Sequence, residues 1–404
     1  MKKILWVLLA AMLLMSLAAC GAEDTPETTA PPYEVEIPYT ETAVQRPYEG
    51  VELTFRVIWR KDDPKSRVLT QAAELFERTT GAKVKITRAK NAEADVMQVS
   101  ASDFALMPAE EMLDLTALAE NAGYAERSYK ALRELSISQS GVLCAVPQVP
   151  YLGGIYYNAD VFINCGITRT PHTWEEFVSL CALLRQGGWS PLTLDNEDAV
   201  TAMELYLRRI VGSEDMARFM TKDAHWHFDL RVVDAMEQVR LFVQDGNMTY
   251  GTPAEYPMGQ NKMGLSNSVM MVGTNADCVA VEESTLTDLN WGVFPFPGTV
   301  GSGTWVSADM LVIDPDCENP QAAFDFMMLL VTGEFDQLRV DISGGIPADP
   351  GNRSPIAGVA QALEAAPPEP LGVFGAKQTD AAVKLWSGWY SKASSYAQAL
   401  ERSK

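Results

Sequence analysis

The stretch VELTFRVIWRKDDPKSRVLTQAAELFERTTGAKVKIT, residues 51–87, decides the fold class of this chain. Its beginning, residues 51–59, is rich in β-branched and aromatic side chains, which predicts a strand. Apolar residues then recur with helical spacing from 68 to 76, and Gly81 is a typical helix stop. Residues 84–87 predict a second strand. This order of strand, helix and strand predicts a parallel sheet with helices on its faces, an α/β fold.

The same alternation continues along the rest of the chain. Further strands are expected at 95–99, 155–157, 291–296 and 310–313, and further helices at 199–210, 232–244 and 320–331. Thr173 and Glu176 form a capping box before an apolar stripe, which predicts another helix start. The apolar run 142–158 contains Pro147 and Pro150, so we expect it to be broken, with a strand only at its end.

The first twenty residues have the pattern of a secretory signal. Lys2 and Lys3 precede an apolar run at 4–14, and small residues lead to Cys20. A bacterial lipoprotein carries its lipid on a cysteine directly after the cleavage site, so we expect residues 1–19 to be removed and Cys20 to be acylated. The alternative is an uncleaved anchor, but the apolar run is shorter than the roughly 20 residues of a spanning helix.

Residues 20–48 are predicted to be an extended tether, because they are rich in Pro, Thr and Glu and lack apolar periodicity. The folded body is therefore expected outside the cytoplasm, anchored to the cell membrane by the N-terminal lipid. It contains roughly 350 residues, which is large enough for two lobes. The formal net charge of the chain is −21, which argues against nucleic acid as a partner.

Cysteine usage predicts no disulfide framework. Five cysteines follow Cys20, none of them in a C-x-x-C pair, and their number is odd. Most lie among apolar neighbours and are expected to be packed thiols. A bridge between Cys165 and Cys181 stays open at this point.

Sequence motifs of the common enzyme classes are missing. With only three histidines the chain contains no H-E-x-x-H motif, and it has no nucleophile elbow, no P-loop and no dinucleotide-binding fingerprint. His225 and His227 could offer two imidazoles to a metal, but no further Cys or His lies nearby in the sequence. The acidic run 195–198 lacks the spacing and the glycine of a calcium loop. We expect no catalytic residues, no metal and no cofactor.

The residues that point to a function are aromatic and polar side chains near the ends of expected strands. The chain has 9 tryptophans and 13 tyrosines, and several lie where expected strands end. In parallel sheets the ligand crevice lies outside the carboxyl ends of the strands. Sugar rings offer C–H faces that stack on aromatic rings, and hydroxyl groups that bond with Asp, Asn or Gln. The candidate stacking residues are Trp59, Tyr151 and Trp305, and the candidate hydrogen-bonding residues are Gln98, Ser100, Asp103, Asp195, Asn196 and Asp309.

From residue 51 to about 392 the chain resembles the extracellular solute-binding proteins of carbohydrate ABC importers, the group of maltose-binding protein. The order and combination of the resembling stretches are specific. These stretches are ELFERTTGAKVKI (74–86), ADVMQVS (94–100), VLCAVPQVPYLGGIYYNADVFINCGI (142–167), TWEEFVSLCALLRQGGWSPLTLDN (173–196), WGVFPFPG (291–298), and PQAAFDFMMLLVTGEFDQ (320–337) through GGIPA (344–348). The segment 259–268 departs from the G-K-A-A-M pattern that is usual in the family.

The resemblance implies a type II periplasmic-binding-protein-like fold, with two α/β lobes and a ligand cleft between them. Lobe 1 would comprise 49–155 and 297–348, and lobe 2 would comprise 156–296 and 349–404. Residues 156–158 would be the first hinge crossover and 293–296 the return. Closure around the ligand would be a hinge motion.

The function that the resemblance implies is a monomeric, non-enzymatic receptor. It would capture a mono- or oligosaccharide and deliver it to the permease subunits of an ABC transporter. Three alternatives stay open: another solute in the same fold, such as a peptide, polyol or polyamine; a surface glycosidase, which needs two carboxylates about 5–9.5 Å apart; and a partner of a sensor kinase.

Overall fold

The computed structural model describes residues 46–219, 225–250, 268–285, 289–298, 300, 303–366, 376–389 and 391–402. The predicted signal peptide, Cys20 and nearly all of the predicted tether lie outside these ranges, as do residues 259–267. Gln45–Lys404 form one compact unit. Within the described ranges, no helix combines the length and the hydrophobicity needed to cross a bilayer.

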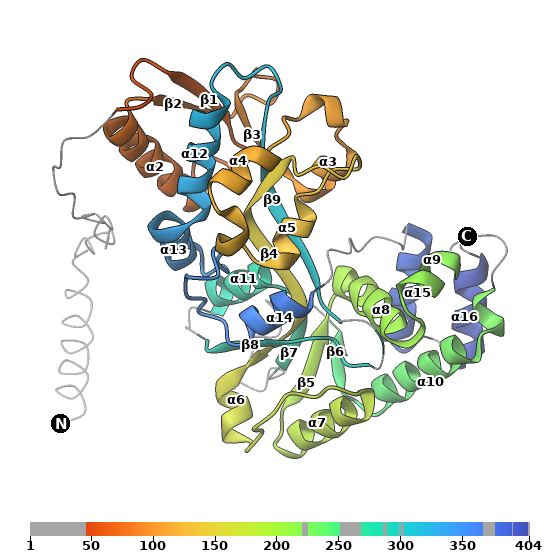
Figure 1. Ribbon diagram of the computed structural model, residues 1–404. Helices are drawn as coiled ribbons and strands as arrows, with labels where there is room; N and C mark the ends of the chain where they lie inside the picture. The colour runs from red at the N-terminus through yellow and green to blue at the C-terminus, as the bar shows by residue number, and fades with distance from the viewer. Residues whose placement is uncertain are drawn as a thin grey trace, which may run out of the picture. The chain divides into compact units, whose positions relative to one another are not determined.

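A single mixed sheet organises the unit. The strands run in the order β2-β1-β3-β9-β4-β7-β5-β6, and β8 pairs with β4 beside this path (Figure 1). Their bounds are β1 Glu52–Arg56, β2 Lys83–Thr87, β3 Val96–Ser100, β4 Ala145–Asn158, β5 Ser190–Leu194, β6 Met248–Tyr250, β7 Ser268–Thr274, β8 Trp291–Phe294 and β9 Trp305–Ile313. This arrangement confirms the α/β fold class.

The N-terminal βαβ unit forms as its sequence predicts. Strands β1 and β2 are parallel, with Glu52 opposite Lys83, and α2 (Lys65–Thr80) connects them. The helix ends at Gly81, which has a φ of +87° and donates its backbone N–H to Glu77. Only glycine adopts this left-handed conformation without steric cost, so the stop is encoded locally.

The run 142–158 corrects one expectation, because most of it is a single strand, β4 of 14 residues. Its first half pairs with β9 and its second half with β7 and β8. The register shifts between Pro147 and Val149, which marks a bulge. Gln148 is the extra residue of this bulge, while Pro147 and Pro150 stay opposite Met310 and Ala308 of β9. A bulge adds a residue without ending the strand, so pairing with β9 continues through the two prolines.

Strand β9 corrects a second expectation. It begins at Trp305, five residues before the apolar run 310–313 that predicted it. Its polar residues belong to the strand because β4 pairs with both Ser307 and Asp309, and β3 pairs with Asp309 on the other side. Tertiary pairing therefore extends the strand beyond its apolar core.

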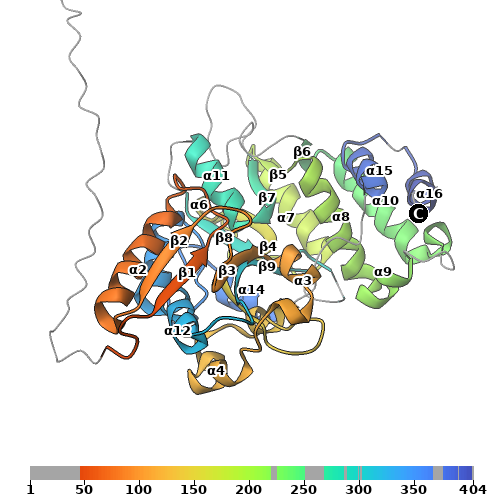
Figure 2. The same cartoon turned by 90° about the horizontal axis from the view of Figure 1, so that it is seen from above.

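Helices cover the sheet. Their bounds are α3 Ala101–Leu106, α4 Thr116–Asn121, α5 Lys130–Leu135, α6 Ala159–Asn164, α7 Trp174–Gln186, α8 Asn196–Val211, α9 Ser213–Phe219, α10 Leu230–Gln244, α11 Asn275–Thr285, α12 Pro320–Val331, α13 Gly333–Ser343, α14 Val359–Ala365, α15 Ala376–Trp386 and α16 Ala393–Arg402. The capping box of Thr173 and Glu176 is present at the start of α7. Helices α10, α15 and α16 pack side by side (Figure 2).

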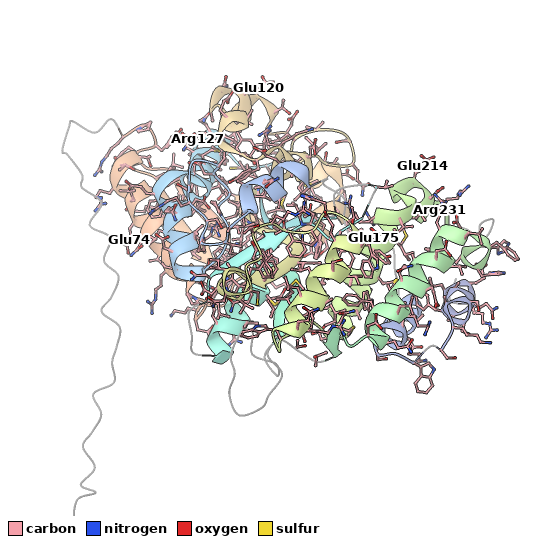
Figure 3. All side chains as sticks on the ribbon, turned by 90° about the horizontal axis from the view of Figure 1, so that it is seen from below. Glu74, Glu120, Arg127, Glu175, Glu214 and Arg231 are labelled. Carbon is pink, nitrogen blue, oxygen red and sulfur yellow. The ribbon has the colours of Figure 1, made fainter. Side chains whose placement is uncertain are left out.

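The core of the second half of the chain is aromatic. Trp174 packs against Phe177, Tyr206, Phe242 and Phe296, with ring centroids 4.3–6.4 Å apart. The charged residues labelled in Figure 3 lie instead on the outer surfaces of the helices and loops. All five described cysteines are free thiols, so the bridge between Cys165 and Cys181 is not formed. The two-lobe boundaries stay a prediction.

Candidate functional site

Three of the candidate residues meet at one carboxylate. Trp59 Nε1 donates a hydrogen bond of 2.8 Å to Asp309 Oδ2, and the Tyr151 hydroxyl donates one of 3.1 Å to the same oxygen. The residues come from the loop after β1, from β4 and from β9. Asp309 is only 8 % exposed. The sheet therefore gathers, from three segments far apart in sequence, an aromatic and acidic cluster.

The carboxylate of this cluster lies in a weakly solvated environment. Burial raises the pKa of Asp309, although the hydrogen bonds from Trp59 and Tyr151 and the charges of Lys65 and Arg339 act in the opposite direction. The pKa of the Tyr151 hydroxyl is also raised, first by burial and then by the nearby Asp309. Ionisation of Asp309 therefore carries a cost in solvation, which the hydrogen bonds and nearby positive charges partly offset.

The indole of Trp305 lies on the same face of the sheet as Asp309. Trp305, Ser307 and Asp309 alternate along β9, so their side chains share a face. Across the ladder, Gly153 pairs with Trp305 and Tyr151 pairs with Ser307. A Cβ atom built on Gly153 would lie 2.0 Å from three carbons of the indole, so the ring covers this glycine closely.

A surface hollow borders the indole. Trp305, Val306 and Ser307 line it together with residues of α3 and the segment 134–139, and its volume is about 400 Å³. A hollow of this size is within the range of small-molecule sites. The partly exposed aromatic ring therefore faces space that a ligand can enter.

Gln98 and Gln148 form a second buried polar pair beside the cluster. Gln98 Oε1 accepts a hydrogen bond of 3.0 Å from the Ile58 backbone N–H, and its Nε2 donates one of 2.7 Å to Gln148 Oε1. Both glutamines are 1 % exposed. Gln98 thereby fixes the backbone next to Trp59, and direct contact with a ligand stays a prediction.

Ser100 and Asp103 mark the start of α3. Ser100 lies opposite Asp309 in the ladder between β3 and β9. Its hydroxyl accepts a hydrogen bond from the Asp103 backbone N–H at 3.0 Å and donates to Asp103 Oδ2 at 2.7 Å. The pair caps the helix next to the cluster, with the Asp103 carboxylate exposed to solvent.

Asp195 is not brought to this cluster. It follows β5, and β7 and β4 separate β5 from β9 in the sheet. The Asp195 backbone N–H donates a hydrogen bond of 3.3 Å to Asp198 Oδ2, and the Asp198 backbone N–H donates one of 2.9 Å to Asp195 Oδ1. This reciprocal capping explains why α8 begins before residue 199. The side chain of Asn196 lies outside the described part of the structure.

Sequence reasoning missed several residues that complete the cluster. Lys65 Nζ lies 5.3 Å from the centroid of the Trp59 ring. Asn275, 2 % exposed, accepts a hydrogen bond of 3.0 Å from the Leu152 backbone N–H beside Tyr151. Gln148 alone carried a usable signal, since it is a polar residue within an apolar run.

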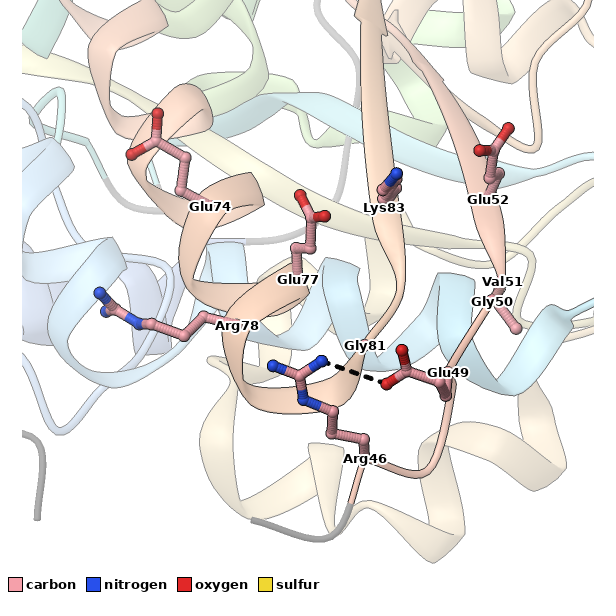
Figure 4. A pocket seen from close by; sticks show the side chains of 10 residues that line it. All are labelled: Arg46, Glu49, Gly50, Val51, Glu52, Glu74, Glu77, Arg78, Gly81 and Lys83. Atoms are coloured by element: carbon pink, nitrogen blue, oxygen red, sulfur yellow. Dashed lines mark hydrogen bonds and ion pairs between the residues drawn. The ribbon is translucent and has the colours of Figure 1, made fainter. Parts of the chain in front are cut away.

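A second hollow, shown in Figure 4, has a different character. It lies where α2 ends, has a volume of about 490 Å³, and is lined largely by charged residues of both signs. Arg46 and Glu49 form an ion pair of 3.3 Å across it. Among the described residues that line it none is aromatic, so these residues offer no surface on which a sugar ring would stack.

We expect Asp309→Asn to change the pH dependence of stability. Because the folded state raises the pKa of Asp309, it holds that proton more tightly than the unfolded chain does. Stability contributed by this group is therefore greatest at low pH and is lost as pH rises from the ordinary carboxyl pKa through the folded one. Each unit of raised pKa corresponds to about 1.4 kcal/mol.

Urea unfolding of the wild type and the variant between about pH 4 and pH 7 measures this effect. The variant should gain stability relative to the wild type as pH rises. Asp316→Asn, which changes an exposed aspartate, is the matched control. A difference between Asp309→Asn and wild type that stays constant with pH would contradict the prediction.

The chain matches a family model and many solved structures. The model of the family "Bacterial extracellular solute-binding protein" matches residues 68–332. None of the curated proteins matches the chain.

Three solved structures illustrate the likeness in fold. The apo-form of RafE from Streptococcus pneumoniae is 16 % identical, with 90 % of this chain and 98 % of that chain covered and a TM-score of 0.65. The bacterial solute receptor AcbH is 16 % identical, with 89 % and 98 % covered and a TM-score of 0.65. A chitin oligosaccharide binding protein is 17 % identical, with 87 % and 97 % covered and a TM-score of 0.58. At these identities the likeness shows the fold.

Proposed function

The chain belongs to the bacterial extracellular solute-binding proteins, and from this premise we propose that it captures a sugar or oligosaccharide outside the cell and delivers it to the permease of an ABC transporter. The observation that carries the proposal is the shared sheet face of Trp305, Tyr151 and Asp309, together with an open hollow that Trp305 lines. Aromatic surface and a hydrogen-bond acceptor on one face suit a sugar chain, whose rings stack and whose hydroxyl groups donate hydrogen bonds.

The roles of the residues follow from their exposure. Trp305, which is partly exposed, would stack on a C–H face of the sugar. Both described hydrogen bonds to Asp309 end on Oδ2, so Oδ1 would accept a bond from a ligand hydroxyl. Trp59 is 7 % exposed, and its Nε1 already donates a hydrogen bond to Asp309 Oδ2. Trp59 would therefore hold the Asp309 carboxylate in place without contacting the ligand itself.

Two of the structural neighbours have been solved with a bound sugar. RafE has been solved in complex with raffinose, and a sugar transporter from Bacillus licheniformis in complex with stachyose. These ligands belong to those proteins, and they support an oligosaccharide as the class to test first on this chain.

The proposed mechanism is binding without bond cleavage. The two predicted lobes would close over the ligand about the predicted crossovers 156–158 and 293–296, and the closed form would dock on the permease. A lipid on Cys20 and the tether 20–48 would keep the receptor at the membrane near its permease. The family is one of solute receptors, which favours this mechanism over the glycosidase alternative.

A carbohydrate screen by thermal shift tests the proposal. At a ligand concentration of 100 times Kd, binding stabilises the folded state by about 2.7 kcal/mol, which raises the melting temperature by a few degrees. We expect such a shift with at least one di- or oligosaccharide, and no released reducing sugar in the same samples. Peptides, polyols and polyamines in the same screen provide the comparison. A shift confined to one of those classes would overturn the sugar proposal, and turnover would indicate a glycosidase.

A further inference from the structure

Two histidines and a glutamate meet at a surface site away from the aromatic cluster. His225 and His227 flank Trp226 in the short 3-10 helix η3 (Trp226–Phe228), and Glu401 lies in the last turn of α16. His225 Nδ1 lies 2.8 Å from Glu401 Oε1, and His227 Nδ1 lies 3.8 Å from Glu401 Oε2. One ligand atom from each residue falls within 4.8 Å of the others.

The geometry of the three groups is fixed by the surrounding fold. Glu401 Oε2 also accepts a hydrogen bond of 3.0 Å from the backbone N–H of Trp226, whose side chain is fully buried. The His227 ring packs on Phe228 with centroids 3.9 Å apart. The carboxylate is thus held between the two imidazoles, and the side chains keep exposed fractions of 48 % for His225, 26 % for His227 and 20 % for Glu401.

One atom of this group is unexplained by the protein alone. Nδ1 of His227 is buried and has no hydrogen-bond partner within the described ranges. Buried polar atoms normally have partners, and an imidazole nitrogen can satisfy its lone pair on a metal ion. This unpaired nitrogen faces a carboxylate and a second imidazole, which are themselves metal ligands.

We propose that His225, His227 and Glu401 form a binding site for a divalent transition-metal ion, with Zn²⁺ as the best-fitting ion. Zinc takes histidine nitrogen and carboxylate oxygen ligands at about 2.0–2.1 Å in a tetrahedron, which places neighbouring ligand atoms roughly 3.3 Å apart. The distance from His225 Nδ1 to Glu401 Oε1 is 2.8 Å, and the distance from His227 Nδ1 to Glu401 Oε2 is 3.8 Å. These two distances lie below and above the tetrahedral spacing. Water would take the fourth position, and the ion would tie α16 to η3. The site is independent of the sugar proposal.

Titration of the chelator-treated, full-length chain with ZnCl₂ tests this site. We expect one ion per chain in calorimetry, and a tetrahedral visible spectrum when Co²⁺ replaces Zn²⁺. His225→Ala and His227→Ala should each weaken Zn²⁺ binding at least tenfold. His172→Ala is the matched control, because His172 is the remaining histidine of the chain and lies exposed before α7, outside the proposed site. Its affinity for Zn²⁺ should equal that of the wild type.

Glu401→Gln keeps the proposal testable if an alanine variant fails to fold. The glutamine retains an oxygen that can accept the hydrogen bond from the Trp226 N–H, while it removes the anionic ligand. We expect this variant to fold, as judged by circular dichroism, and to bind Zn²⁺ at least tenfold more weakly. The chain carries a net charge of −21, so binding by scattered carboxylates is the alternative. That alternative predicts equal Zn²⁺ binding by wild type, His227→Ala and Glu401→Gln, and such equality would overturn the proposal. An absence of Zn²⁺ binding by wild type would also overturn it.

Discussion

Trp305→Ala is expected to weaken sugar binding roughly 30- to 150-fold, because an aromatic side chain that a ligand covers contributes about 2–3 kcal/mol. The indole lies partly exposed beside the hollow and on the face that carries Asp309. It also packs against the core of the second half of the chain, so the variant should lose a little stability but still unfold cooperatively. Calorimetric titration with the best sugar from the screen measures the loss.

Trp389→Ala is the matched control for this experiment. Trp389 is 74 % exposed and lies beyond α15, outside the aromatic cluster, so its removal should leave the sugar affinity unchanged. If Trp305→Ala binds the sugar as tightly as wild type, Trp305 serves packing alone and the proposed binding face is wrong. An equal loss in both variants would indicate a general effect on the fold.

The elements that the sequence predicted well are those whose signals are local. The stop at Gly81 follows from the backbone conformation that only glycine adopts freely, and the capping box of Thr173 and Glu176 satisfies backbone donors within one turn. The βαβ unit followed from apolar periodicity over a few dozen residues. None of these signals needs a partner distant in sequence.

The two strands whose extent was predicted wrongly, β4 and β9, depend on partners distant in sequence. The prolines of β4 argued for a break, yet β9 pairs with the strand across a bulge. The first five residues of β9 include the polar Ser307 and Asp309, and pairing with β4 extends the strand back to Trp305. A pattern within one segment carries no information on which segment will lie beside it.

The candidate site shows the same division. The residue types of Trp59, Tyr151 and Asp309 suggested a sugar site, but their convergence on one oxygen depends on sheet order. Gln98 was predicted as a ligand contact; the structure places its side chain in a buried hydrogen bond to Gln148, which its residue type did not reveal, and contact with a ligand stays a prediction. Glu401 is 176 positions from His225, so the third potential metal ligand was invisible in the sequence.

Gly153→Ala is expected to reduce sugar affinity about as much as Trp305→Ala, although it adds only a methyl group beneath the ring. The new Cβ would lie 2.0 Å from carbons of the Trp305 indole, far below van der Waals contact, so the ring must leave its position. Overpacking of this kind costs about 1–3 kcal/mol of stability as well. Gly166→Ala is the control, since a Cβ there meets nothing within 4 Å, although its φ of +72° adds some strain.

A double-mutant cycle decides whether Gly153 acts through the indole. In the Trp305→Ala background the clash no longer exists, so Gly153→Ala should change sugar affinity by less than about twofold there. If both single variants lose affinity and the double variant loses no more than either, the glycine serves to seat the ring on the sheet. Additive losses would mean instead that Gly153 contributes to the binding face by a route that does not involve the Trp305 ring.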